Sequence, residues 1–194
     1  LSQYRHYALK KDINIEGGDM YNEELSVREY SLIEIAEIFN NYNKDSQFDE
    51  LFNKVYNFCQ TAGVKFIVNP IVKSKDGTPR PGKASGNTII LNQIYFNHKN
   101  VPKQRKAKTI LHEMIHTSSV YAINAYAKAK GKEAVAMPDK LYKSCKKLES
   151  VYNSIKNHPL FEQEYGIKHP AEMVAELSNS EFVLKLKYTY PSIW

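Results

Sequence analysis

The stretch between Pro102 and Gly131 constrains the fold of this chain most, because it contains neither glycine nor proline. Proline is well tolerated in the first turn of a helix and glycine commonly follows the last turn, so we expect one long helix over residues 102–130. Its first half contains the sequence HEMIH, which begins at His112 and ends at His116. Side chains four residues apart lie on one helix face, so both imidazoles can reach a single metal ion.

The residues between the two histidines complete the chemistry of this motif. Zinc binds imidazole pairs readily, and Glu113 would lie beside the open coordination position, where it can take a proton from an attacking water. Met114 and Ile115 are apolar and can seat the helix in a core. The motif therefore predicts two zinc ligands, His112 and His116, and a general base.

A catalytic zinc normally takes three protein ligands, so the sequence must supply a third. The best candidate is Glu172, because Glu176 follows four residues later on the same helix face. One carboxylate could bind the metal while the other accepts the second N–H of a ligand histidine and orients its ring. Three competing ligands are His158, His169 and Asp139. The HExxHxxGxxH extension is absent, which argues against three histidine ligands, although His169 stays an alternative.

The first part of the chain is expected to be helical, followed by a strand. Ser26 can cap a helix that runs roughly to Asn40, because the apolar residues that follow have an approximate helical period. A second helix is expected from about Asp45 to the stop at Gly63. The alternation of apolar and polar residues over 64–68 then predicts a half-buried strand.

The remaining elements surround the long helix. Residues 73–86 are rich in turn formers and are expected to form a loop without a regular element, whereas residues 87–92 predict a second strand. A lysine-rich helix is expected over 138–157. A short helix is expected over 170–177, with a continuation after Asn179 toward Leu186.

The 194 residues are enough for one domain that buries its core without disulfides, so a metal would serve chemistry rather than hold the fold. We divide this single domain, residues 1–194, into a helical part (about 1–62), a part with the sheet and the metal helix (about 63–131), and a helical part (about 132–194). Cys59 and Cys145 lie far apart in the sequence and are expected to be buried thiols rather than metal ligands.

The net charge of +6 comes from scattered lysines, which solvated helix faces explain better than a nucleic-acid partner. No apolar run is long enough to span a membrane, and the first residues, LSQYRHYALKKD, lack the apolar core of a signal peptide. A soluble domain is therefore expected. The chain begins at Leu1, so bacterial cytoplasm, a phage virion and secretion after removal of a signal all remain open, as does the oligomeric state.

The combination of HEMIH with the later sequence YGIKHPAEMVAE resembles the catalytic domain of anthrax lethal factor and related small gluzincins. It also resembles metallopeptidase domains within large polyvalent proteins of bacteriophages and other mobile elements. The resemblance covers mainly residues 88–186 and is most specific at the metal helix and at a tyrosine followed after seven residues by one glutamate and after eleven by another. The chain departs from lethal factor at His169 and Pro170, where lethal factor has Asn and Glu.

This resemblance implies an α+β, zincin-like metallopeptidase fold, mostly helical with a small mixed sheet, and Zn²⁺ as the cofactor. It makes Glu172 the third zinc ligand, places Glu176 behind the ligands, and makes Tyr165 a phenol that stabilises the oxyanion or protonates the leaving group. It also implies that the strand over residues 87–91 has a free edge to which an extended protein or peptide substrate adds. The sequence leaves open the alternative that this strand is internal and has no free edge.

The leading hypothesis is therefore a zinc endopeptidase. The resemblance to polyvalent-protein domains also motivates a second hypothesis, a zinc-bearing binding or structural module of a phage or mobile-element protein with little or no peptidase activity. A basic nucleic-acid-binding domain is a third hypothesis, and it predicts affinity that falls steeply with salt.

Overall fold

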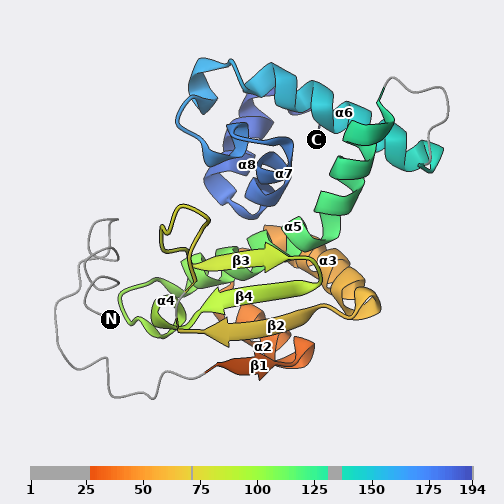
Figure 1. Ribbon diagram of the computed structural model, residues 1–194. Coiled ribbons are helices and arrows are strands. Elements are labelled where there is room, and N and C mark those ends of the chain that lie inside the picture. Colours follow the sequence, from red (N-terminus) through yellow and green to blue (C-terminus); the bar gives the residue numbers. More distant parts are fainter. Residues whose placement is uncertain (1–26, 71, 131–136, 194) are drawn as a thin grey trace. The chain divides into compact units, whose positions relative to one another are not determined.

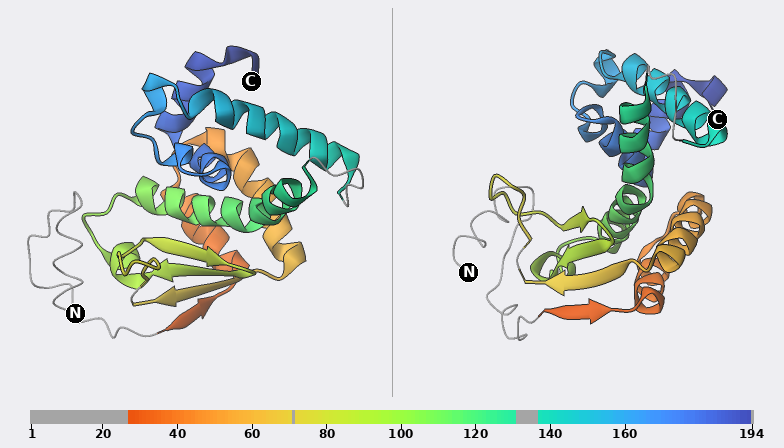
Figure 2. Two further views of the ribbon diagram at one scale, coloured as in Figure 1. Left: turned by 45° about the horizontal axis from the view of Figure 1, so that its top comes forward. Right: turned by 45° about the vertical axis from the view of Figure 1, so that its right-hand side comes forward.

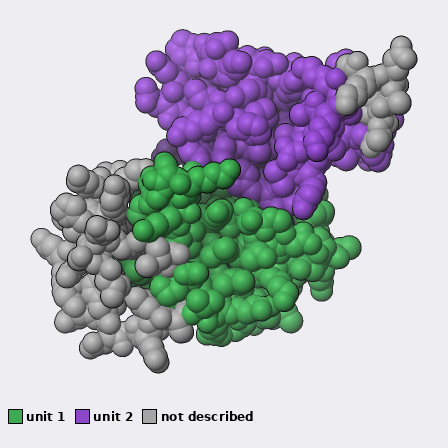
Figure 3. Space-filling model, in the orientation of Figure 1, with its two compact units in different colours: residues 1–114 green, residues 115–194 purple. Residues whose placement is uncertain are grey.

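The computed structural model describes residues 27–70, 72–130 and 137–193. The chain is mostly helical with one small mixed sheet, as predicted for an α+β protein (Figure 1). It divides into two compact units, unit 1 (Leu1–Met114) and unit 2 (Ile115–Trp194), coloured separately in Figure 3. The boundary falls inside the long helix α5 (Lys103–Ala129), which is continuous through it.

Among the described residues of unit 1, the sheet has four strands in the order β1-β2-β4-β3. The strands are β1 (Arg28–Tyr30), β2 (Lys65–Asn69), β3 (Gly82–Ser85) and β4 (Thr88–Asn92). Strands β2 and β4 pair in parallel, whereas β1 pairs with β2 and β3 pairs with β4 in the antiparallel sense. The predicted strands over 64–68 and 87–92 thus correspond to β2 and β4.

Helices α2 (Leu32–Tyr42) and α3 (Asp49–Ala62) lie against the sheet (Figure 2). They contact each other through the stacked rings of Phe39 and Phe52, whose centroids lie 3.9 Å apart. Alternate residues of the central strands, such as Phe66 and Ile89, are fully buried in this core. A 3₁₀ turn, η2 (Ser46–Phe48), begins the second predicted helix, and Gly63 ends it with a φ of 65°.

The start predicted for the first helix was wrong. Ser26 lies outside the described residues, and Arg28–Tyr30 forms β1 rather than helix. Helix α2 begins after Ser31, whose hydroxyl accepts from the Glu34 N–H while the Glu34 carboxylate accepts from the Ser31 N–H, which makes a complete capping box. Backbone pairing of β1 with β2, which local sequence does not reveal, decides the conformation before this cap.

Two predictions about the segment before the metal helix were also wrong. Residues 73–86 contain a regular element, since β3 occupies their last part. Consequently β4 is an internal strand with partners on both sides, and the free edge predicted for residues 87–91 does not exist. At this end of the sheet the edge strand is β3. Helix α4 (Gln93–Asn97) then connects β4 toward α5.

In unit 2 the second part of α5 is followed by α6 (Asp139–Ile155), α7 (Pro170–Ala175) and α8 (Ser180–Thr189), as predicted from the sequence. The described part of this unit also contains four 3₁₀ turns: η3 (Pro159–Phe161), η4 (Tyr165–Ile167), η5 (Glu176–Ser178) and η6 (Pro191–Ile193). These elements enclose an apolar core made of Ile155, Phe161, Met173, Phe182 and Leu186.

Hydrogen bonds connect α6 to two neighbouring segments of this unit. The Tyr126 hydroxyl, on α5, donates to the Glu149 carboxylate over 2.9 Å, and the Lys130 amine donates to the same carboxylate over 2.6 Å. The Tyr152 hydroxyl donates to the backbone carbonyl of Ile167 over 2.8 Å and thereby ties α6 to η4.

Both cysteines are buried free thiols, as predicted. Burial raises the pKa of Cys59 to about 11, so this thiol stays protonated and does not offer a metal a thiolate. Among the helices of the described residues, none has the length and apolar character required to cross a membrane.

Candidate metal centre

Helix α5 carries the HEMIH motif at the place predicted from the sequence. Met114 and Ile115 are buried, which fixes the rotation of the helix about its axis. His112 and His116 are half-buried one turn apart on the same helix. Their relative positions are therefore set by one rigid element, and the motif offers two imidazole nitrogens on one face.

Glu172 reaches the motif from the first turn of α7. The local sequence explains why a helix begins there: the His169 imidazole accepts from the Ala171 N–H over 3.1 Å as the N-terminal cap, and Pro170 occupies the first turn. The Glu172 Oε2 atom lies 3.0 Å from His116 Nε2. Both side chains are largely buried, with 20% and 16% of their surfaces exposed.

His112, His116 and Glu172 form a group that could hold a metal ion. Each offers one ligand atom, and these atoms lie within 4.8 Å of one another. Zinc bonds of 2.0–2.2 Å in a tetrahedral site place ligand atoms roughly 3.3 Å apart, so the contact between His116 and Glu172 needs to open by only a few tenths of an ångström. Two imidazoles and one carboxylate match a catalytic zinc set. Within the described parts of the chain no other group of this kind is found.

The three competing ligands have other contacts. His158 and His169 each cap a helical turn through Nδ1, at η3 and α7 respectively. Asp139 pairs with Lys143 on the exposed first turn of α6. None of the three belongs to the group that could hold a metal.

Tyr165 lies beside Glu172 in unit 2. Its hydroxyl donates to Glu172 Oε1 over a long distance of 3.4 Å, and the Lys168 amine lies 4.6 Å from the centre of its ring. The next residue, Gly166, packs so closely that a Cβ atom there would lie 2.9 Å from the Phe182 ring and 3.3 Å from the Met173 backbone. This close packing holds η4 against α7 and so fixes the phenol near the carboxylate.

Glu176 is buried, with 5% of its surface exposed, and its Oε2 atom accepts from the Asn179 side-chain amide over 2.8 Å. A buried carboxylate held in this way is rigid, which suits a residue that orients a neighbour. The contact with a ligand histidine stays a prediction.

Glu113 is also buried, with 8% of its surface exposed, and it lies against Gly82 of β3. Sequence reasoning missed Gly82, because it assigned this residue to a loop. The sequence around it, Gly-Lys-Ala-Ser, carries no strand signal, and a glycine inside a strand indicates a close backbone approach only once the strand is known.

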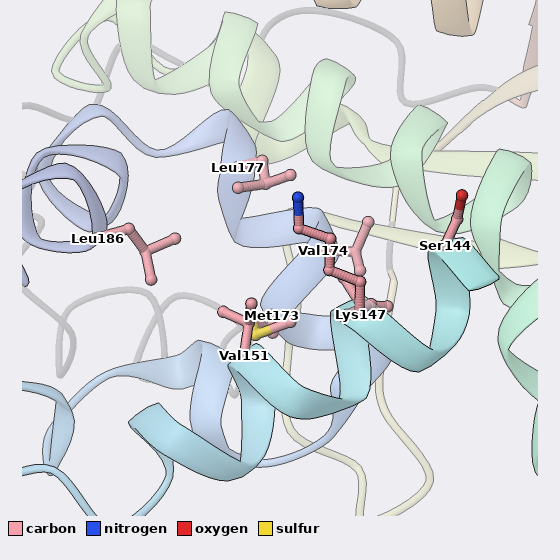
Figure 4. Close-up of a pocket in the computed structure, with 8 residues that line it drawn as sticks. Ser144, Lys147, Val151, Met173, Val174, Leu177 and Leu186 are labelled. Atoms are coloured by element: carbon pink, nitrogen blue, oxygen red, sulfur yellow. The ribbon is translucent and has the colours of Figure 1, made fainter. Parts of the chain in front are cut away.

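An apolar pocket of about 260 Å³ adjoins α7 in unit 2 (Figure 4). Met173 and Val174, which directly follow Glu172, contribute to its wall, so α7 presents the carboxylate and the pocket on different faces. The lining residues are Ser144, Lys147, Leu148, Val151, Met173, Val174, Leu177 and Leu186.

Compared with protein-family models, with curated proteins and with solved structures, the chain gives no match to any of the three.

Proposed function

We propose that this chain is a zinc-dependent endopeptidase that hydrolyses peptide bonds with a water molecule. The observation that carries the proposal is the convergence of His112, His116 and Glu172, whose ligand atoms lie within 4.8 Å of one another. The two histidines lie on α5, which also carries Glu113, and Glu172 lies on α7. A bound Zn²⁺ would supply Lewis acidity, which activates water and polarises the substrate carbonyl. The resemblance to small gluzincins points to the same reaction and to a zincin-like fold.

In this proposal Glu113 is the general base. It follows His112 directly, and its burial keeps bulk water from competing for its hydrogen bonds. The carboxylate takes a proton from the attacking water and delivers it to the leaving amine as the peptide bond breaks. Glu113 is unprotonated again after the reaction, because the proton that it took from water ends on the leaving amine.

Tyr165 is the proposed donor to the oxyanion. The 3.4 Å contact of its hydroxyl with Glu172 is weak, so the phenol can exchange it for a stronger hydrogen bond to a developing negative charge. The neighbouring Lys168 amine favours this orientation of the ring through a cation–π contact.

Strand β3 is the proposed docking strand for the substrate. It pairs only with β4 among the strands of the described residues, which leaves the backbone groups of its other side for an extended peptide. Strand β3 thus replaces β4, which was expected from the sequence, as the strand to which the substrate adds. A peptide bound along β3 would lie near Glu113, because Gly82 of this strand packs against the Glu113 side chain.

Cleavage of a peptide library, followed by mass spectrometry, tests the proposal. Wild-type protein loaded with zinc should produce cleavage products, and Glu113→Gln should abolish them while it keeps the metal, because the amide cannot accept a proton. Glu37→Gln, on the exposed face of α2, is the matched control and should cleave normally. Equal cleavage by Glu113→Gln would remove Glu113 from the mechanism, and zinc binding without any product would favour a zinc-bearing binding module.

A further inference from the structure

Strand β3 passes Glu113 at Gly82 so closely that a side chain at position 82 would fit only if its neighbours shifted. A Cβ atom at Gly82 would lie 3.1 Å from Glu113 Cγ, 3.3 Å from Thr109 Cγ2 and 3.4 Å from Glu113 Oε1. The first two distances are shorter than ordinary van der Waals contacts. Gly82, Thr109 and Glu113 all belong to unit 1, so this packing lies within one compact body.

The backbone of Gly82 does not itself require glycine. Gly63, Gly77 and Gly86 have positive φ angles and open space around the missing side chain, whereas Gly82 is an extended strand residue opposite Leu91. Glycine weakens a strand relative to alanine, so a requirement other than local conformation must favour it here. The requirement that the structure provides is space for the Glu113 side chain.

We propose that Gly82 is a positioning residue for the general base, an inference that rests on the proposed function. An added methyl group would require Glu113 to give way by a few tenths of an ångström at Cγ, in the middle of its side chain, and a rotation that achieves this displaces the carboxylate at the end by more. A misplacement of about 1 Å in a catalytic group can cost on the order of 100-fold in rate. Gly82 thus determines where the Glu113 carboxylate lies. It has no side chain that could contact the substrate, so it acts through Glu113.

The first test measures the contact without reference to catalysis. Urea denaturation of zinc-free Gly82→Ala and Glu113→Ala, singly and combined, forms a double-mutant cycle. Gly82→Ala should lower the unfolding midpoint in the wild-type background, and it should lower it much less once Glu113→Ala has removed Cγ and the carboxylate. An equal loss in both backgrounds would overturn the proposal, because the clash would then lie elsewhere, with Thr109 as the remaining neighbour.

The second test measures turnover at equal zinc content. Gly82→Ala should keep its zinc and its KM within a few-fold and lose about 100-fold in kcat. Gly86→Ala is the matched control: it strains a backbone with a φ of 57° and so lowers stability, yet it touches no part of Glu113 and should keep kcat. Unchanged kcat in Gly82→Ala would refute positioning. A wild-type protein without any cleavage would instead refute the proposed function, and the stability cycle would still decide whether Gly82 fixes Glu113.

Discussion

Glu172 lies far from the HEMIH motif in sequence, yet its carboxylate contacts His116 directly. The helical period explains why the two histidines could be predicted: spacing along a single helix fixes their separation. Glu172 was predictable as a candidate because a second glutamate follows it at helical spacing. The choice between Glu172 and His169 needed the structure, which shows that His169 caps α7.

Tyr165 provides a prediction at the residue scale. Tyr165→Phe should lower kcat by about 100-fold and leave zinc content unchanged, because it removes one donor to the oxyanion and no metal ligand. Steady-state kinetics and metal analysis measure both effects. Tyr126→Phe, which removes a hydroxyl that bonds to Glu149 away from the proposed chemistry, is the control. A loss of zinc in Tyr165→Phe would mean that the phenol holds Glu172 rather than the oxyanion.

Glu149 gives a prediction of pH dependence. The Lys130 amine, and to a lesser degree the Tyr126 hydroxyl, hold the pKa of Glu149 below its ordinary value of 4.5 despite burial, and burial together with Glu149 raises the pKa of Tyr126 to about 12. A carboxylate with a lowered pKa stabilises the folded state above its ordinary pKa, and this contribution disappears as pH falls through the lowered value.

Glu149→Gln should therefore reduce the free energy of unfolding by about 1 kcal/mol at pH 7. The difference from wild type should shrink as pH falls below 4.5. Urea denaturation at a series of pH values measures it. A difference that stayed constant down to the acid limit would show that lost packing, rather than charge, causes the effect.

At the scale of elements, the helices were predictable and the edges of the sheet were not. Pro102 and the absence of breakers define α5, and Gly63 ends α3 through its left-handed conformation. By contrast, β3 consists of Gly-Lys-Ala-Ser, which has little intrinsic strand preference and is a strand only because it pairs with β4. Tertiary pairing likewise decides β1.

The capping box of α2 gives a prediction for this scale. Ser31→Ala should lower the free energy of unfolding by about 1 kcal/mol, because the first turn loses a side-chain acceptor. Denaturation with urea measures the change. Ser150→Ala, on the exposed surface of α6, should have almost no effect or a slightly stabilising one. Equal stability of Ser31→Ala and wild type would contradict the assignment of Ser31 as the cap.

At the scale of the whole molecule, the boundary between the two units falls within the HEMIH motif, between Met114 and Ile115. Helix α5 continues through this boundary. The base Glu113 and its neighbour Gly82 belong to unit 1, whereas His116, Glu172 and Tyr165 belong to unit 2. A metal bound by His112, His116 and Glu172 would stabilise the folded chain by mass action, and more so as free zinc rises above the dissociation constant.

The metal content of the purified protein tests the central claim most directly. Elemental mass spectrometry should find close to one zinc per wild-type chain, a large loss in His116→Ala and Glu172→Ala, and no loss in the control His169→Ala, which removes only a helix cap. Absence of zinc from the wild type after reconstitution, or equal zinc in Glu172→Ala and wild type, would contradict the account.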